Sequence, residues 1–216
     1  LEWPRVPMTP PLRAVLLDYG VGNLASVAKA LERAGVRVAV SDSPAQVRHA
    51  RALVLPGVGA FRDAAARLEQ SGLGDAVCAR VAAGVPLLGV CLGLQLLFEG
   101  SSEGGEWRGL GILAGQVERL ETPYKVPHIG WNELAWQPAG ARMATGLPVP
   151  AYAYFVHSYA ARPADRSIVA AVTNYGGSVV AAVVRDAVWA AQFHPEKSST
   201  TGLRILANWA SMAAEA

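Results

Sequence analysis

Short apolar runs alternate with amphipathic stretches through the first half of this chain, and this alternation restricts the fold more than any other feature. The runs AVLLDYG, VRVAVSD, ALVLPG and PLLGVC begin at residues 14, 36, 52 and 86. Runs that are apolar nearly throughout are typical of strands in a parallel sheet that helices cover on both faces. The sequence therefore predicts a three-layer α/β fold with a mostly parallel central sheet, whose functional sites form at the carboxyl ends of the strands.

The stretches between these runs predict helices. Between Leu24 and Leu31, apolar residues recur at spacings of three and four, and Asn23 is placed to cap that helix. Further helical segments are expected over residues 44–51, 61–70 and 73–83, and another follows directly after residue 91.

The second half is rich in strand-like runs. The runs QVERL, AYAYFVHSYAA, SIVAAVTNY, SVVAAVV and AVWAAQF begin at residues 116, 151, 167, 178 and 187, with turns expected at 174–177 and 185–186. We expect them to continue the same sheet with antiparallel strands, and a helix over residues 203–212 to close the chain. Without a repeat or linker, residues 13–216 are predicted to form one domain.

Charge and composition exclude several functions. Nineteen Lys and Arg against seventeen Asp and Glu give a net charge of +2, too balanced for a nucleic-acid-binding face. The proline-rich residues 1–12 lack the apolar segment of a signal peptide, so a loose extension is expected. The uncharged stretch 81–98 is interrupted by glycines and Pro86, which favours a buried strand and helix over a membrane span. We therefore expect a cytoplasmic protein.

The segment GVCLG, at residues 89–93, lies where a buried strand is predicted to become a helix. It has the form of a nucleophile elbow with cysteine as the nucleophile, and its glycines permit the sharp turn. The helix start favours the thiolate form of Cys91, and the N–H of Leu92 faces an oxyanion formed on an attacked carbonyl. The alternative is that Cys91 is a small buried hydrophobe. Cys78 lacks this setting and is expected in the core.

A thiolate nucleophile needs a general acid or base, which the four histidines could supply. His194 ends an apolar strand, and Glu196 lies close enough along the chain to orient its imidazole. The sequence thus predicts a catalytic set of Cys91, His194 and Glu196. The other histidines are expected to be solvated, structural or substrate-lining, and are His49, His128 and His157. The two cysteines form neither a zinc site nor a disulfide framework, and we expect no metal and no cofactor.

The turn LPGVGAF follows another predicted strand and shares its sheet edge with Cys91. Gly57 and Gly59 allow main-chain N–H groups to turn inward, so Val58 or Gly59 is predicted to supply a second oxyanion donor. Such turns by themselves often only reverse the chain.

Three motifs, in order, resemble the class I (triad-type) glutamine amidotransferases, from about Arg13 to the C-terminus. They are PGVGAF, GVCLGLQLLF and QFHPEKS. Four further motifs are similar to one branch of that family, the glutaminase subunits of imidazole glycerol phosphate synthases from histidine biosynthesis. They are DYGVGN, PHIGWN, YFVHSY and HPEKS.

The resemblance implies that Cys91 attacks the side-chain amide of L-glutamine and that ammonia and glutamate result. It further implies four glutamine-binding residues, which are Gln95, Glu103, Ser158 and Tyr159. Because nothing in the chain would bind the acceptor nucleotide, it also implies a partner, the cyclase subunit, a (β/α)8 barrel, in a heterodimer. Trp131 and Lys197 are candidates for that interface, although Trp131 could equally be core.

Three alternatives remain at this stage. The chain could be an amidotransferase subunit of another biosynthetic synthase, since specificity lies in the partner. A thiol hydrolase acting on esters or peptides would use the same elbow and histidine. A non-catalytic interaction module is a third alternative, which the intact Cys91, His194 and Glu196 oppose.

Overall fold

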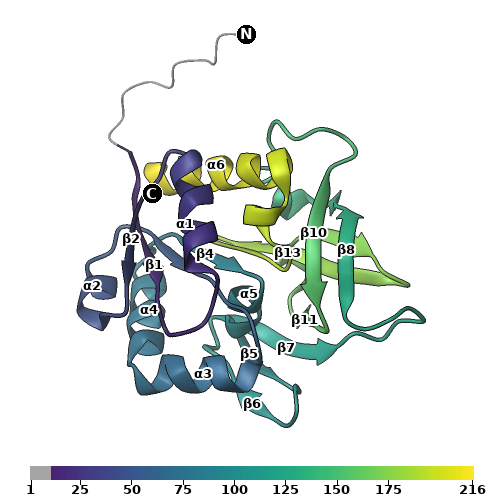
Figure 1. Cartoon of the computed structure of the whole chain (residues 1–216), viewed down its shortest axis with the longest axis horizontal. Coiled ribbons are helices and arrows are strands. Elements are labelled where there is room, and N and C mark those ends of the chain that lie inside the picture. Colours follow the sequence, from purple (N-terminus) through teal and green to yellow (C-terminus); the bar gives the residue numbers. More distant parts are fainter. Residues whose placement is uncertain (1–10) are drawn as a thin grey trace.

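A computed structural model describes residues 11–216, built around an eight-stranded sheet with helices on both faces (Figure 1). The first half of the chain supplies the parallel part, with elements β1 (Arg13–Leu17), α1 (Leu24–Arg33), β2 (Arg37–Ser41), α2 (Pro44–Arg48), β3 (Leu53–Leu55), α3 (Phe61–Gln70), α4 (Leu73–Ala82) and β4 (Leu87–Val90). The sheet order is β2-β1-β3-β4-β14-β13-β12-β9, whose last four members are β14 (Val188–Ala191), β13 (Ser178–Arg185), β12 (Val169–Asn174) and β9 (Ala135–Trp136). The first five strands in this order are parallel.

The two faces of this sheet carry separate hydrophobic cores, because side chains alternate along each strand. On β1, Ala14 and Leu16 pack with α1 and α6 (Ser199–Glu215), whereas Leu17 packs with α2, α3 and α4 on the other face. The side chain of Asn23 accepts a hydrogen bond from the Ser26 backbone N–H and caps α1, as predicted. The predicted three-layer α/β fold is confirmed.

Some strands of the second half join this sheet, and the others form separate sheets. The strands that join it are β9 (Ala135–Trp136), β12 (Val169–Asn174), β13 (Ser178–Arg185) and β14 (Val188–Ala191). The pairs β9–β12, β12–β13 and β13–β14 are antiparallel, and β14 then returns parallel to β4. This part of the prediction is confirmed.

The expectation that every strand of the second half continues one sheet is wrong. A four-stranded sheet has the order β11-β7-β5-β6, and β10 pairs with β8 alone. Their bounds are β5 (Phe98–Ser101), β6 (Trp107–Arg108), β7 (Leu113–Arg119), β8 (His128–Glu133), β10 (Tyr152–His157) and β11 (Tyr159–Pro163). Buried residues alternate with exposed or partly exposed ones along β7 and β10, so each strand buries one face only, unlike a strand of a sheet covered on both sides.

Two helix boundaries also differ from the prediction. The helix after Cys91, α5 (Leu92–Leu96), is short, because Phe98 opens β5 opposite Leu113. The closing helix α6 is longer than predicted at both ends. Within residues 11–216, three 3-10 turns complete the elements, which are η1 (Pro138–Gly140), η2 (Arg166–Ile168) and η3 (Pro195–Lys197).

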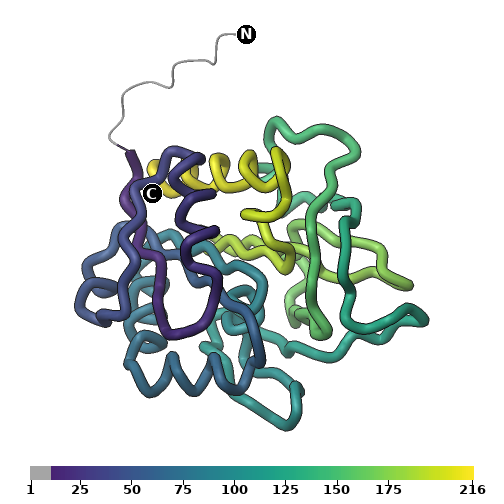
Figure 2. The backbone as a smooth tube through the Cα atoms, in the orientation of Figure 1, coloured from purple at the N-terminus to yellow at the C-terminus, as the bar shows by residue number. Residues whose placement is uncertain are grey.

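The predicted extension, residues 1–12, lies mostly outside the described residues. Of its last two residues, Leu12 packs against the core on the α1 face, and its carbonyl accepts a hydrogen bond from the Arg37 N–H. In the chain trace of Figure 2, the green segment with β8 and β10 lies at the opposite side of the molecule from β2. None of the helices within residues 11–216 is long and apolar enough to cross a membrane.

Candidate active site

Cys91 lies at the carboxyl end of β4, at the start of α5, with φ 54° and ψ −110°. A non-glycine residue with positive φ is strained, and such strain is concentrated at functional sites. Two glycines allow the turn, since a Cβ on Gly93 would overlap the carbonyl oxygen of Leu55 and one on Gly89 would crowd Ala190. The turn leaves Cys91 7% exposed at the carboxyl edge of the sheet.

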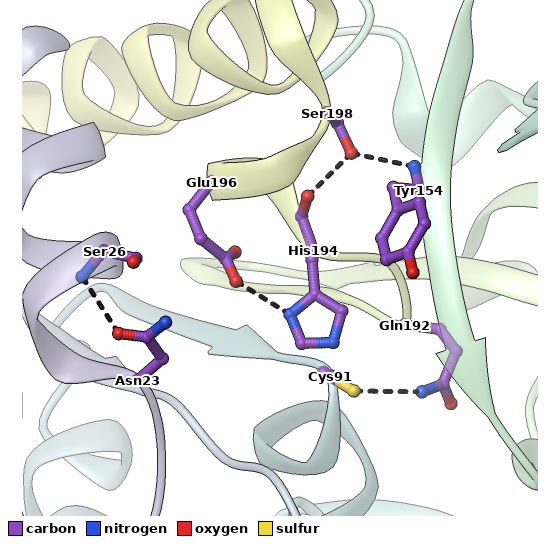
Figure 3. A network of polar contacts seen from close by, with 8 residues as sticks. All are labelled: Asn23, Ser26, Cys91, Tyr154, Gln192, His194, Glu196 and Ser198. Carbon is purple, nitrogen blue, oxygen red and sulfur yellow. Dashed lines mark hydrogen bonds and ion pairs between the residues drawn. The ribbon is translucent and has the colours of Figure 1, made fainter. Parts of the chain in front are cut away.

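His194 reaches the same edge from the neighbouring strand. Because β14 runs parallel to β4 with Ala191 opposite Val90, the residues that follow the two strands emerge side by side. The Nδ1 atom of His194 lies 2.8 Å from Oε1 of Glu196, and both side chains are almost fully buried. Figure 3 shows the imidazole between this carboxylate and the sulfur of Cys91.

The charge state of His194 follows from these neighbours. Burial by itself lowers the pKa of His194, but the neighbouring Cys91 sulfur and the hydrogen-bonded Glu196 carboxylate outweigh it and raise the pKa to about 9. The Nε2 atom is buried, makes no hydrogen bond within residues 11–216, and faces the sulfur in Figure 3. At neutral pH the arrangement therefore favours an imidazolium next to the sulfur.

Backbone hydrogen bonds from β10 hold His194 in place. The N–H of His194 donates to the carbonyl of Tyr154 at 2.9 Å. The hydroxyl of Ser198 donates to the His194 carbonyl at 2.7 Å and accepts from the Tyr154 N–H at 3.0 Å (Figure 3). Because Ser198 is fully buried, the position of the imidazole depends on the position of β10.

The turn after β3 packs directly against the start of α5. A Cβ on Gly57 would lie 2.9 Å from the Leu92 Cβ, and Gly59 has φ +99°. The hydroxyl of Tyr19 donates to the Pro56 carbonyl inside this turn. Burial, and then the proximity of Cys91, raise the pKa of Tyr19, so this hydroxyl remains a donor across the physiological range.

A pocket of about 270 Å³ opens over Cys91. Its lining includes every residue predicted as an oxyanion donor or glutamine ligand, together with two members of the predicted catalytic set. These residues are Val58, Gly59, Cys91, Leu92, Gln95, Glu103, Ser158, Tyr159 and His194. Glu196 lies behind His194, away from the pocket lining.

Two of the residues predicted to bind the substrate glutamine also make hydrogen bonds within the protein. The Nε2 atom of Gln95 donates to the carbonyl of Tyr159 at 2.9 Å and to Oε1 of Gln192 at 3.0 Å. The Oε2 atom of Glu103 accepts the backbone N–H of Phe61 at 2.7 Å and so caps α3. These bonds do not involve Oε1 of Gln95 or Oε1 of Glu103.

Sequence reasoning missed Gln192. Gln192 is fully buried, and its Nε2 lies 3.9 Å from the Cys91 sulfur. A polar residue inside the apolar run AVWAAQF was the available signal. His157 lines the pocket and its Nε2 lies 3.1 Å from Nδ1 of the buried His128, consistent with the structural or substrate-lining role expected for both.

The two interface candidates lie outside the pocket. Trp131 is 51% exposed on β8, with its ring 6.1 Å from that of Tyr154. The Nζ atom of Lys197 lies 6.0 Å from the same Tyr154 ring. The alternative that Trp131 is a core residue is therefore wrong. Among residues 11–216, no group of three or more His, Cys, Asp or Glu side chains could hold a metal ion.

Comparison with known proteins defines the class to which this fold and site belong. The family model described as "Glutamine amidotransferase class-I" matches residues 15–212. A crystal structure of a glutamine amidotransferase shares the fold with a TM-score of 0.73 at 23% identity, covering 92% of this chain and 98% of the other. The PurLQS structure from Thermotoga maritima gives 0.72 at 16% identity, over 92% and 97% of the two chains. The chain belongs to the class I glutamine amidotransferase family.

Within that family the chain belongs with the HisH subunits of imidazole glycerol phosphate synthase. It is 48% identical to this subunit from Moorella thermoacetica, over 90% of this chain and 92% of the relative. The Aquifex aeolicus subunit is 49% identical, over 92% and 96%. The Symbiobacterium thermophilum subunit is 50% identical, over 93% and 94%. The predicted resemblance is confirmed.

Proposed function

We propose that the chain hydrolyses L-glutamine to glutamate and ammonia and passes the ammonia to a cyclase subunit that forms imidazole glycerol phosphate for histidine biosynthesis. One observation carries this proposal: Cys91 and His194, whose imidazole is bonded to the Glu196 carboxylate, line the same pocket in a chain related to HisH subunits. Neither a thiol hydrolase nor another synthase subunit explains the relationship to HisH subunits.

The first half-reaction forms a thioester. The Cys91 sulfur attacks the side-chain carbonyl carbon of glutamine, and the C–N bond breaks as His194 gives its proton to the departing nitrogen, so ammonia leaves neutral. Glu196 holds the imidazole in the orientation that this transfer needs. The raised pKa of His194, about 9, keeps that proton available at neutral pH.

Backbone donors stabilise the oxyanion that precedes the thioester. The proposed donors are the N–H of Leu92, at the start of α5, and that of Val58 or Gly59 in the facing turn. The close packing of Gly57 against Leu92, and the presence of Val58, Gly59 and Leu92 in the pocket lining, support this assignment.

The second half-reaction restores the enzyme. His194, neutral after the first step, takes a proton from water as the water oxygen attacks the thioester carbonyl. The C–S bond breaks, glutamate leaves, and the thiolate and imidazolium are regenerated. The sum is glutamine plus water giving glutamate, neutral ammonia and one proton, which the new side-chain carboxyl group releases.

Glutamine recognition is assigned to Gln95, Glu103, Ser158 and Tyr159, which share the pocket with Cys91. The Glu103 carboxylate is the group that suits the α-ammonium of an amino acid. The Gln95 oxygen adds an acceptor, because its nitrogen is already bonded to Tyr159 and Gln192.

The ammonia acceptor is proposed to lie in a partner. Ammonia in water near neutral pH is mostly protonated and non-nucleophilic, so it must pass to the second site by an enclosed route. The proposed partner is the cyclase subunit, a (β/α)8 barrel, in a cytoplasmic heterodimer. Trp131 and Lys197 are its proposed contacts, because aromatic and cationic residues on an exposed face are typical anchors.

The test is ammonia release from glutamine, with and without the cyclase and its ligand. We expect low activity alone, stimulation by that cyclase, and at least about a 1,000-fold loss in Cys91→Ala. Cys78→Ala is the matched control and is expected to keep wild-type activity, since Cys78 lies outside the pocket. Full activity of Cys91→Ala, or stimulation by no cyclase, would contradict the proposal.

A further inference from the structure

A buried glutamine lies against the sulfur of Cys91 without a role in the reaction described above. Gln192 follows β14, two residues before His194, and its side chain is fully buried. A buried carboxamide is costly unless its donors and acceptors are bonded. Its contacts therefore show what the residue does.

The orientation of this carboxamide is fixed by its neighbour Gln95. The Nε2 atom of Gln95 donates to the Tyr159 carbonyl and to Oε1 of Gln192, which uses both of its hydrogens. Oε1 of Gln192 is thus an acceptor, and the NH2 group must lie on the other side of the carboxamide. That side faces Cys91.

The sulfur is the acceptor that residues 11–216 offer to this NH2 group. The distance from Gln192 Nε2 to Cys91 Sγ is 3.9 Å, within reach of a hydrogen bond to the larger sulfur atom. In Figure 3 the NH2 group and the imidazole of His194 approach the sulfur from different directions. Because a neutral thiol accepts hydrogen bonds weakly and an anion accepts them strongly, a donor fixed here favours the anion.

We propose that Gln192 is a positioning residue for Cys91: its carboxamide, held by Gln95, donates an N–H to the sulfur, fixes the side chain toward the pocket and stabilises the thiolate. The inference rests on the proposed role of Cys91 as the nucleophile. It gives Gln95 a second task, which is to set the orientation of Gln192.

The test is the pH dependence of Cys91 alkylation by iodoacetamide in the full chain, followed by mass spectrometry of the labelled peptide. Two variants are compared with the wild type. Gln192→Met keeps the length of the side chain without a donor, and Gln192→Asn keeps the carboxamide but withdraws it from the sulfur. Gln137→Met, at an exposed glutamine, is the control.

We expect the midpoint of the pH–rate profile to move to higher pH by at least about half a unit in both Gln192 variants, with about a threefold or greater loss of alkylation rate at pH 7. The control keeps the wild-type midpoint. A purely structural role for Gln192 would not move the midpoint. Labelling of the half-buried Cys78 reports local unfolding in the same samples and is expected to stay at the wild-type rate.

A Gln192 variant counts as folded when its Cys78 is labelled at the wild-type rate. An unchanged Cys91 midpoint in such a variant would overturn the inference. Ammonia release by the wild-type chain with the cyclase is measured in parallel and separates the two proposals. Release without a shifted midpoint contradicts the role of Gln192 alone. A shifted midpoint without release supports the Gln192 contact and contradicts the glutaminase activity.

Discussion

The Nδ1 atom of His128 lies 3.1 Å from Nε2 of His157. The chain of contacts continues at both ends to acceptors, from His157 Nδ1 to the Tyr159 carbonyl and from His128 Nε2 to Oδ1 of Asn132. Asn132 cannot reverse its amide without losing the bond from Nδ2 to the Asn174 carbonyl. Three hydrogen bonds would need three protons and two neutral imidazoles carry two, so the contact between His128 and His157 holds no proton while the pair is neutral.

The first prediction concerns acid stability. Burial lowers the pKa of His157 to about 4 and also lowers the pKa of His128, so the folded pair stays neutral where the unfolded chain takes up protons. The neutral histidines contribute to the free energy of unfolding above pH 6.5, and this contribution is lost as pH falls towards 4. For His157 it amounts to about 3 kcal/mol. We expect His157→Gln to lose less stability over this window in urea unfolding.

The control for this experiment is the exposed His49. His49→Gln is expected to keep the wild-type dependence on pH, because the side chain lies on the surface. Parallel curves for the wild type and His157→Gln between pH 6.5 and 4 would contradict the prediction.

The second prediction has the opposite sign, because the pKa of His194 is raised. Burial opposes the positive charge of His194, but Cys91 and Glu196 raise its pKa to about 9. The stability that these two residues contribute is therefore complete below pH 6.5 and is lost as pH rises through 9. Cys91→Ala removes one of the two stabilising partners. We expect its His194 ring, followed by NMR, to titrate at lower pH than in the wild type; an equal midpoint would show that the sulfur does not interact with the imidazole.

The place of the catalytic set could be predicted from the sequence, because it depends on strand ends. Cys91 and His194 each follow an apolar run, and parallel neighbours bring such positions together at one edge. Glu196 was predictable from its local spacing. Their chemical roles stay predictions until the variants are assayed.

Other parts of the site depend on contacts that no local pattern specifies. Glu103 caps a helix that begins 42 residues earlier, and Gln192 bonds to a glutamine 97 residues away. The separate sheet of β5, β6, β7 and β11 was missed because β6 and β5 are too short to show periodicity. The alternation of apolar and polar residues could identify β7 as a strand. It could not identify the strands that pair with β7, because many different pairings would bury the same apolar face.

The third prediction tests the close approach behind the nucleophile. In Gly93→Ala the new Cβ would overlap the carbonyl oxygen of Leu55, and backbone on both sides must shift. We expect a loss of about 3 kcal/mol in the free energy of unfolding. Gly35→Ala is the control: it has φ +87° but open space, so only backbone strain of about 1 kcal/mol is expected. Equal losses in the two variants would contradict the role of packing.

The fourth prediction separates two tasks of Glu103. Glu103→Gln keeps an oxygen for the Phe61 N–H but removes the charge, so we expect KM for glutamine to rise about tenfold with kcat nearly unchanged. Glu103→Ala also removes the cap and is expected to cost about 1 kcal/mol of stability. Glu99→Gln is the matched control, because Glu99 accepts the Gly115 N–H outside the pocket. A raised KM in that control would assign the effect to general disturbance.

The fifth prediction concerns the proposed cyclase interface. Trp131 is 51% exposed on β8, on the face opposite the buried His128, and Ile129 on the same face is 59% exposed. An aromatic side chain at the centre of an interface typically contributes 2 kcal/mol or more, so we expect Trp131→Ala to raise the Kd for the cyclase about 30-fold, measured by calorimetry. Val149→Ala, at a loop residue that is 95% exposed, is expected to bind like the wild type. Because Trp131 is half exposed in the free chain, its removal should leave the free energy of unfolding within about 1 kcal/mol of the wild type. An unchanged Kd would place the cyclase on another face of the molecule.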